Sequence, residues 1–151
     1  MALVHARDKE SAVWGWLKGQ LPLLKLRHHV HRVENAAEVG DPDVEGCIDG
    51  RSFHIELKVA ERYRADGSFE VRIKSEQAYW AHRRVKAGGR SWVLIRAAVG
   101  QQRLHYLIPG DVTIELFEAR LKLTHRMLEG WSSIRPDATG TAIWLAAIDR
   151  I

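Results

Sequence analysis

The 151-residue sequence has little of what several classes of protein require. It contains a single cysteine, Cys47, which can form no internal disulfide and cannot supply the thiolates of a structural zinc site. It has no uncharged stretch of about 20 residues, the length that spans a bilayer, and early charges interrupt the apolar run that a signal peptide needs. We therefore expect a soluble, cytoplasmic protein with no membrane partner.

Internal repeats, low-complexity tracts and linkers rich in proline or serine are also missing from the sequence. The hydrophobic fraction of 46% and the charged fraction of 28% are those of an average globular domain. We therefore expect a single domain over residues 1–151, built around one hydrophobic core.

Positive charge is concentrated in the middle of the chain, although the net charge is only +4. Residues 60–103 carry ten Lys and Arg against four Asp and Glu, whereas residues 34–56 carry seven acids and one base. Arginines outnumber lysines 16 to 7, and a planar guanidinium suits bidentate contacts with phosphate. The basic segment 60–103 is therefore a candidate surface for nucleic acid; the alternative is an ordinary solvated surface.

The clearest structural signal is a β-hairpin. Two strand-like runs, 43–47 and 52–59, flank Asp49-Gly50, a dipeptide typical of two-residue hairpin turns because both central positions need a positive φ. Apolar and polar residues alternate in the second run, so the polar ones share one face of the strand. That face carries His54, Glu56 and Lys58.

Helical and strand-like periods alternate through the rest of the chain. The segments expected to be helical are 9–21 (with Asp8 as N-cap), 76–87 (with Ser75 as N-cap), a helix from Asp111 or Thr113 to Gly130, and 142–151. The segments expected to be extended are 28–34, 69–73, 92–99 and 104–108. This order predicts an α/β protein of the α+β type, with a central mixed β-sheet flanked by helices.

The hairpin brings two carboxylates and a lysine to one end of the sheet. Asp43 begins the first strand, Glu56 lies near the end of its antiparallel neighbour, and Lys58 follows on the same face. Converging carboxylate oxygens suit Mg²⁺ or Mn²⁺, which also bind phosphate oxygens. A nearby lysine can orient the attacking water and offset phosphate charge. This is the minimum set for metal-assisted phosphodiester hydrolysis; the alternative is a turn followed by an ordinary surface ion pair.

A series of short motifs extends on both sides of this hairpin. In chain order they are Arg-Val-Glu at 32–34, Gly-Asp-Pro-Asp-Val at 40–44, Ile-Glu-Leu-Lys-Val at 55–59, Glu-Gln-Ala-Tyr-Trp at 76–80, Ala-Gly-Gly at 87–89 and Val-Leu-Ile-Arg at 93–96. The series resembles the PD-(D/E)xK nuclease superfamily, and within it the virus-type replication-repair nucleases (VRR-NUC), which include small phage-encoded proteins related to Holliday junction resolvases. The resemblance covers about residues 8–108, and we expect residues 109–151 to form a helical extension.

The resemblance implies a restriction-endonuclease-like core and a bound Mg²⁺, for which Mn²⁺ can substitute, with no small-molecule cofactor. The metal ligands that it implies are Asp43, Glu56 and the backbone carbonyl of Leu57. It further implies that Lys58 helps to activate the hydrolytic water and that Gln77 reaches the site from its helix.

Two more features follow from the same resemblance. Its members use a carboxylate from the first helix, for which Glu10 is the natural match, while Glu34 is a rival at the end of an extended segment. The likeness to resolvases, together with the two-fold symmetry of a four-way junction, implies a homodimer.

The residues expected to contact DNA lie on the polar hairpin face and on the following helix: His54, Trp80, Arg83, Arg84 and Lys86. The sequence therefore predicts a Mg²⁺-dependent endonuclease that cuts branched or structured DNA. The alternatives are a non-catalytic DNA-binding module on the same fold and a nuclease of structured RNA.

Overall fold

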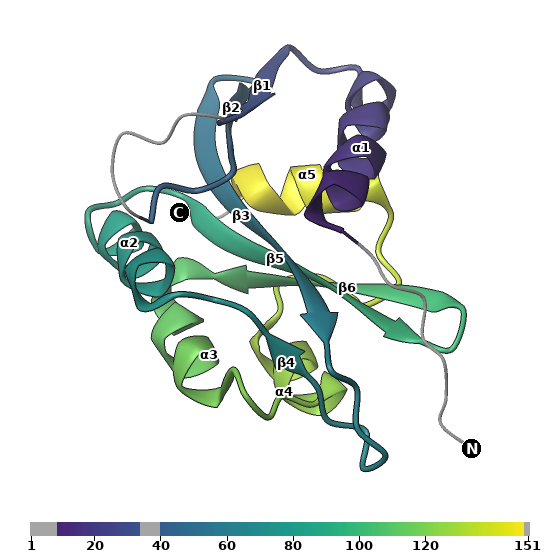
Figure 1. Cartoon of the computed structure of the whole chain (residues 1–151). Helices are drawn as coiled ribbons and strands as arrows, with labels where there is room; N and C mark the ends of the chain where they lie inside the picture. The colour runs from purple at the N-terminus through teal and green to yellow at the C-terminus, as the bar shows by residue number, and fades with distance from the viewer. Residues whose placement is uncertain (1–8, 34–39, 150–151) are drawn as a thin grey trace.

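The computed structural model describes residues 9–33 and 40–149, and within them a mixed β-sheet forms the centre of the molecule (Figure 1). Five strands follow the order β1-β2-β3-β5-β6, and the short β4 pairs with β3. β3 and β5 run parallel, whereas the other pairs are antiparallel. The strands are β1 (His28–Arg32), β2 (Val44–Ile48), β3 (Arg51–Glu61), β4 (Glu70–Val71), β5 (Ser91–Val99) and β6 (Gln102–Pro109).

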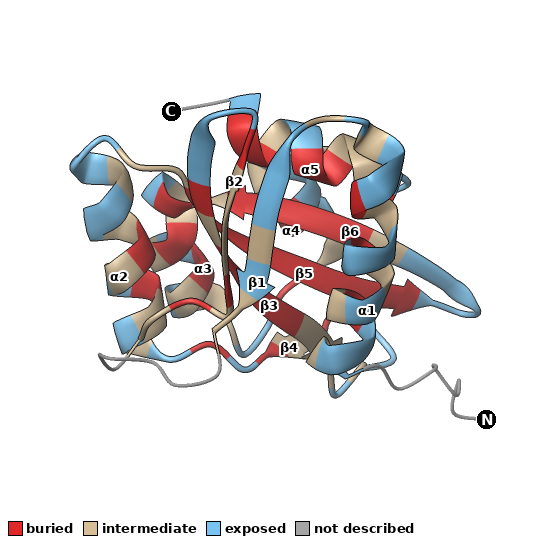
Figure 2. Ribbon diagram, turned by 90° about the horizontal axis from the view of Figure 1, so that it is seen from above, coloured by how far each residue is buried: buried red, intermediate tan, exposed pale blue. Residues whose placement is uncertain are grey.

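Helices cover both faces of this sheet (Figure 2). They are α1 (Glu10–Gln20), α2 (Ser75–Lys86), α3 (Thr113–Ala119), α4 (His125–Trp131) and α5 (Gly140–Asp149), with 3₁₀ turns η1 (Leu21–Leu24) and η2 (Gly110–Val112). This arrangement confirms the predicted α+β class and its mixed central sheet.

The hairpin turn has the predicted conformation. Asp49 and Gly50 connect β2 to β3 with φ values of 50° and 80°, as a two-residue turn that matches the twist of its strands requires. The turn fixes the register, in which Val44 lies opposite Ile55. It therefore also determines which residues of β3 lie opposite the segment that precedes β2.

Alternation along the strands separates two apolar clusters. On one face, Phe53, Ile55 and Leu57 of β3 pack with residues of α1 and α5, among them Leu17 and Trp144. The other face packs under α2, α3 and α4, and contains Val93 and Ile95 of β5, Ala78 of α2, Leu116 of α3 and Leu128 of α4. The polar residues of β3 therefore point to the α2 side of the sheet.

Two predicted helix starts are wrong. Lys9, not Asp8, is the N-cap residue of α1, and Asp8 lies outside the described residues. Ser75 is the first residue of α2, with Lys74 as N-cap. The side chain of Gln77 accepts a hydrogen bond from the Lys74 backbone N–H at 2.9 Å, so Gln77, rather than Ser75, supplies a capping side chain at the start of α2.

The helix predicted up to Gly130 is interrupted. α3 ends at Ala119, and Leu123 exchanges two backbone hydrogen bonds with Phe69, at 2.9 and 2.8 Å. These bonds hold the segment after α3 against the residue that precedes β4. Thr124 then caps α4 by accepting a hydrogen bond from the Met127 N–H at 3.2 Å. A threonine three residues before Met127 is the sequence signal that we missed.

The C-terminal helix α5 lies against α1 and belongs to the apolar cluster on that face. The indole N–H of Trp144 donates to the Leu17 carbonyl at 2.9 Å, and that of Trp92 donates to the Ala147 carbonyl at 3.0 Å. Within residues 9–33 and 40–149, no helix is long and apolar enough to cross a membrane.

Candidate active site

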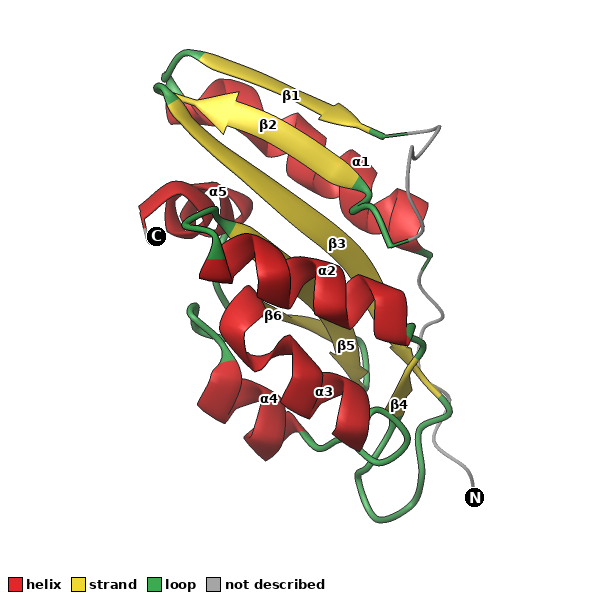
Figure 3. Ribbon diagram, turned by 90° about the vertical axis from the view of Figure 1, so that its left-hand side faces the viewer, coloured by secondary structure: helices red, strands yellow, loops and turns green. Residues whose placement is uncertain are grey.

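Among the residues that the structure describes, a short stretch of β3 has no neighbouring strand on one edge. β2 pairs with β3 only as far as Ile55, and β4 pairs with the same strand only from Ala60 onward. Between them, residues 56–59 have no strand partner on this edge in the described part of the chain, while β5 pairs with their other edge. This opening in the sheet leaves the edge of β3 without a strand partner where its polar side chains gather, and α2 lies in front of the sheet beside it (Figure 3).

Asp43 lies at this opening. It precedes Val44, whose partner is Ile55, so continuing the register places Asp43 opposite Glu56. The Asp43 carboxylate oxygen Oδ2 accepts a hydrogen bond from the Leu57 N–H at 2.9 Å. Because the N–H and C=O of a strand residue point to the same edge, the Leu57 carbonyl also faces the opening. Two carboxylates and one carbonyl thus meet at one place.

The loop before β2 is seated on the start of α2. Gly40 has a φ of 94°, and a Cβ at that position would lie 2.6 Å from the Glu76 backbone oxygen. Only glycine permits both that backbone conformation and that close approach. The Asp43 carbonyl also accepts a hydrogen bond from the Val33 N–H at 2.7 Å. These contacts fix the direction in which the chain enters β2.

Gln77 and Lys58 hold the Glu56 carboxylate from two sides. The Gln77 side-chain nitrogen donates to Glu56 Oε2 at 3.2 Å, while its oxygen caps α2 at Lys74. The Lys58 Nζ lies 3.5 Å from the same Glu56 oxygen. The structure therefore brings together four of the residues singled out in the sequence, Asp43, Glu56, Lys58 and Gln77, together with the Leu57 backbone.

The Glu56 carboxylate is poorly solvated. Only 5% of the residue is exposed, and burial raises the pKa of Glu56 to about 9, with a further increase from the adjacent Asp43 carboxylate and an opposing effect of Lys58. Its second oxygen, Oε1, is buried and has no hydrogen-bond partner among the described residues. A divalent cation would satisfy this oxygen and neutralise the carboxylate pair, so the donor set fits Mg²⁺ or Mn²⁺.

The additional carboxylate expected at the site, from Glu10 or Glu34, stays a prediction. Glu10 lies in the first turn of α1 and lines a groove that also contains Lys58. In the described part of the chain, no third acidic, histidine or cysteine side chain joins Asp43 and Glu56 in a group that could hold a metal. The rival, Glu34, lies outside the described residues.

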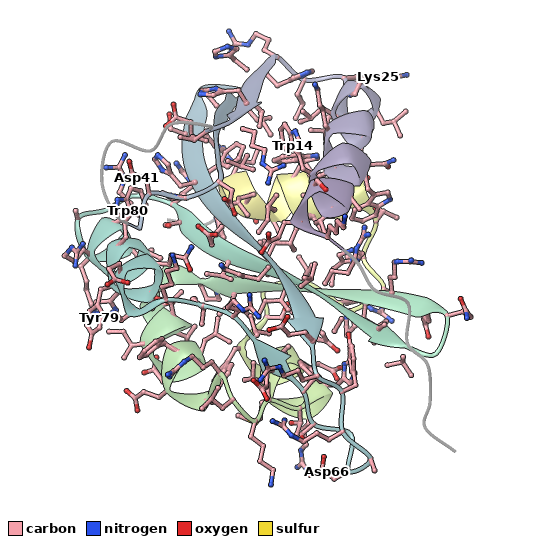
Figure 4. All side chains as sticks on the ribbon, viewed as in Figure 1. Trp14, Lys25, Asp41, Asp66, Tyr79 and Trp80 are labelled. Carbon is pink, nitrogen blue, oxygen red and sulfur yellow. The ribbon has the colours of Figure 1, made fainter. Side chains whose placement is uncertain are left out.

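The residues predicted to contact DNA lie on β3 and α2, the elements that also carry Glu56 and Gln77, and Figure 4 labels Trp80 on α2. The His54 ring meets the edge of Trp80 at a centroid distance of 5.0 Å, and the Arg84 guanidinium lies 5.4 Å from the Trp80 ring centre. Arg83, Arg84 and Lys86 are exposed. His54 is less accessible, with 14% of its side chain exposed, and burial, assisted by Arg84, lowers the pKa of His54.

A row of side chains across three strands was missed in the sequence. His31, Glu45 and His54 occupy matching positions on β1, β2 and β3. The Glu45 carboxylate lies 3.2 Å from His31 Nε2 and 3.6 Å from His54 Nε2. The alternation of each strand was readable from the sequence. The register of β1 against β2 was not, because eleven residues separate the two strands and no short turn sets their pairing.

We expect Glu56→Gln to stabilise the metal-free protein at neutral and alkaline pH. Unfolded Glu56 loses its proton near the ordinary pKa of 4.5, whereas folded Glu56 keeps it to about 9. Between these values the folded state binds more protons, so wild-type stability falls as pH rises, by up to about 1.4 kcal/mol per pH unit. Thermal denaturation in EDTA over this range should therefore show a melting-temperature gap between variant and wild type that widens with pH. A gap independent of pH would contradict the buried, protonated carboxyl.

The sequence matches no protein-family model and no curated protein. Three solved structures are similar to the chain. The first is a VRR_NUC domain, with 18% sequence identity, a TM-score of 0.44, and coverage of 74% of this chain and 97% of that chain. The second is the Holliday junction resolvase Hjc of Archaeoglobus fulgidus, with 16% identity, a TM-score of 0.47, and coverage of 74% of this chain and 86% of that chain. The third is the bacterial homing endonuclease I-Ssp6803I, with 17% identity, a TM-score of 0.39, and coverage of 70% of this chain and 62% of that chain. The likeness concerns the fold, and the chemistry has to come from the residues of this chain.

Proposed function

We propose that this protein is a divalent-metal-dependent endonuclease that hydrolyses phosphodiester bonds in DNA, with branched or structured DNA as its substrate. The observation that supports this most strongly is the buried Glu56 carboxylate, which faces Asp43 and leaves one oxygen without a partner among the described residues. A buried carboxylate beside the half-buried Asp43 carboxylate is unfavourable unless a proton or a cation neutralises the pair. A cation site at an opening in the sheet can accept a phosphate.

Asp43, Glu56 and the Leu57 carbonyl would hold the ion. When bound, Mg²⁺ or Mn²⁺ supplies a Lewis acid for the phosphate and lowers the pKa of a water molecule. The protein supplies the geometry: the Leu57 N–H holds Asp43 in place, and Gln77 holds Glu56 through a side chain that is itself fixed at the start of α2.

Lys58 has two roles in this proposal. Its side chain is 9% exposed, so its ammonium group is held at the site rather than in bulk solvent. It places positive charge beside the position of the phosphate and can donate a hydrogen bond that orients the attacking water. Gln77 is a positioning residue, because it acts on Glu56.

The experiment that tests the function is a cleavage panel. Supercoiled, linear, flapped and four-way-junction DNA, and structured RNA, are incubated with Mg²⁺, Mn²⁺ or EDTA. We expect cleavage of branched DNA with either metal and none in EDTA. Cleavage of RNA alone would mean that the substrate is structured RNA and not DNA. Tight DNA binding without cleavage in either metal would favour the non-catalytic DNA-binding module.

A homodimer would present two sites to the two strands of a junction. Sedimentation equilibrium with and without junction DNA measures this directly. A complex with one protein chain per junction would contradict the dimer while leaving the endonuclease proposal intact.

The double change Arg83→Ala/Arg84→Ala should weaken binding to all DNA sequences alike. Both arginines are exposed on α2, the helix that carries Gln77, and contacts with backbone phosphates release counterions. Each lost phosphate contact should lower the log–log slope of affinity against salt by about 0.9 on duplex DNA. Fluorescence anisotropy at several salt concentrations measures this slope.

The matched control for this change is Arg126→Ala/Arg135→Ala, which removes two positive charges from the C-terminal segment. We expect it to leave the slope unchanged. If the α2 variant also keeps the wild-type slope, the helix is an ordinary solvated surface, and if it loses affinity for one sequence only, the arginines read bases.

A further inference from the structure

A groove of about 400 Å³ opens beside Lys58 and is distinct from the α2 surface. Its walls come from the start of α1, the end of β1, the end of β3 and the segment after β4. The charged residues that line it are Lys9, Glu10, Arg32, Lys58, Glu61 and Arg72. Because Lys58 also lies 3.5 Å from the Glu56 carboxylate, the groove is continuous with the candidate active site.

The charges of the groove are only partly neutralised within the protein. Arg72 lies 3.4 Å from the Glu61 carboxylate, and Lys58 is paired with Glu56. The side chain of Arg32, in contrast, makes no ion pair or hydrogen bond with any residue that the structure describes, although the residue is half-buried. A partly desolvated guanidinium that has no partner in residues 9–33 and 40–149 favours an anionic ligand with paired oxygens, as a phosphate has.

We infer that this groove holds the sugar–phosphate backbone of the cleaved strand next to the scissile phosphate, and that Arg32 contacts a phosphate there. The inference rests on the proposed function. It assigns a substrate-binding role to a residue on β1, on the α1 side of the site and outside the basic segment 60–103. The strand that is cut passes the metal site between two contacts, α2 on one side and this groove on the other.

The first test is binding in EDTA, where no cleavage occurs. Arg32→Ala should weaken the affinity for a short DNA about tenfold at fixed salt. It should also lower the log–log slope of affinity against salt by roughly 0.7 to 0.9, the change expected for the loss of one phosphate contact. Arg51→Ala is the matched control, since Arg51 is an exposed arginine at the opposite end of β3. Arg32→Lys keeps the charge and should restore most of the slope. Equal effects of Arg32→Ala and Arg51→Ala would overturn the inference.

The second test locates the contact along the strand. Single methylphosphonate substitutions, each of which removes the charge of one phosphate, are scanned along a DNA whose cleavage position is known. For the wild type, one substitution within about two phosphates of the cut should weaken binding, and the same substitution should have no further effect on Arg32→Ala. Persistence of that effect in Arg32→Ala would show that another residue contacts the phosphate.

These readouts separate the groove from the proposed function. If the wild type cuts no DNA, the endonuclease proposal fails, yet the loss of salt slope in Arg32→Ala would still support a phosphate in the groove. If the wild type cuts DNA and Arg32→Ala, folded by its melting temperature, binds and cuts normally, the groove inference fails alone.

Discussion

Replacing Asp43 by Asn, or Glu56 by Gln, should lower the rate of DNA cleavage by at least ~10³-fold while DNA binding is kept or becomes tighter. Each substitution removes a carboxylate oxygen and a negative charge from the proposed metal site but leaves the side-chain volume nearly unchanged. Metal-ion stabilisation of the developing charge is worth several kcal/mol, which corresponds to a loss of this size. Binding in EDTA should tighten in Asp43→Asn, because that carboxylate no longer repels the phosphates. In Glu56→Gln it should stay at the wild-type level at neutral pH, because metal-free Glu56 already carries a proton there.

The measurement is single-turnover cleavage of a junction DNA with saturating Mg²⁺, next to anisotropy binding in EDTA. Glu115→Gln serves as the control, because Glu115 is an exposed carboxylate on α3, and it should cut at the wild-type rate. Mg²⁺ should also raise the melting temperature of the wild type and of Glu115→Gln, but not of Glu56→Gln. Wild-type turnover in either site variant would refute the mechanism.

Lys58→Ala should reduce cleavage by about 10² to 10⁴-fold, the range that a positioned proton-transfer or charge-stabilising group contributes. The lysine is almost fully buried at 9% side-chain exposure and lies 3.5 Å from Glu56. Its loss removes the positive charge beside the phosphate. It also removes the charge and the hydrogen bond by which Lys58 lowers the pKa of Glu56.

This second effect gives Lys58→Ala a signature in its pH profile. Because Glu56 has to lose its proton to bind a cation, the rising limb of the rate should shift to higher pH in Lys58→Ala, and a larger metal concentration should be needed. Lys18→Ala, which removes an exposed lysine of α1, is the control. A lower rate with an unshifted profile would mean that Lys58 acts on the phosphate or the water alone.

Local chemistry in the sequence determined the hairpin and the face on which its polar residues lie. Asp49-Gly50 permits the positive φ values of a two-residue turn, and the period of two in β3 separates Glu56 and Lys58 from the apolar side chains. Counting from this turn was enough to predict that Asp43 and Glu56 lie at the same end of the sheet. Both inferences depend on neighbours in the chain, for which local conformational preference is strong.

The helix boundaries were predicted less well, since several groups compete to satisfy a helix end. Gln77 shows this most clearly. Its side chain was expected at the site because of a resemblance, and it does reach Glu56, but it also caps α2 where Ser75 was expected to act. The break at Leu123 depends on hydrogen bonds with Phe69, 54 residues earlier in the sequence, and no local pattern reports such a contact.

Only the tertiary structure decided what surrounds the site. The gap between β2 and β4 along β3, the row of His31, Glu45 and His54, and the groove that contains Arg32 all depend on which strands pair and in what register. The same packing buries Glu56, which a strand face predicted only as polar, and thereby raises its pKa. Residue types and their spacing are local properties, whereas burial and the absence of a partner depend on segments brought together from across the chain.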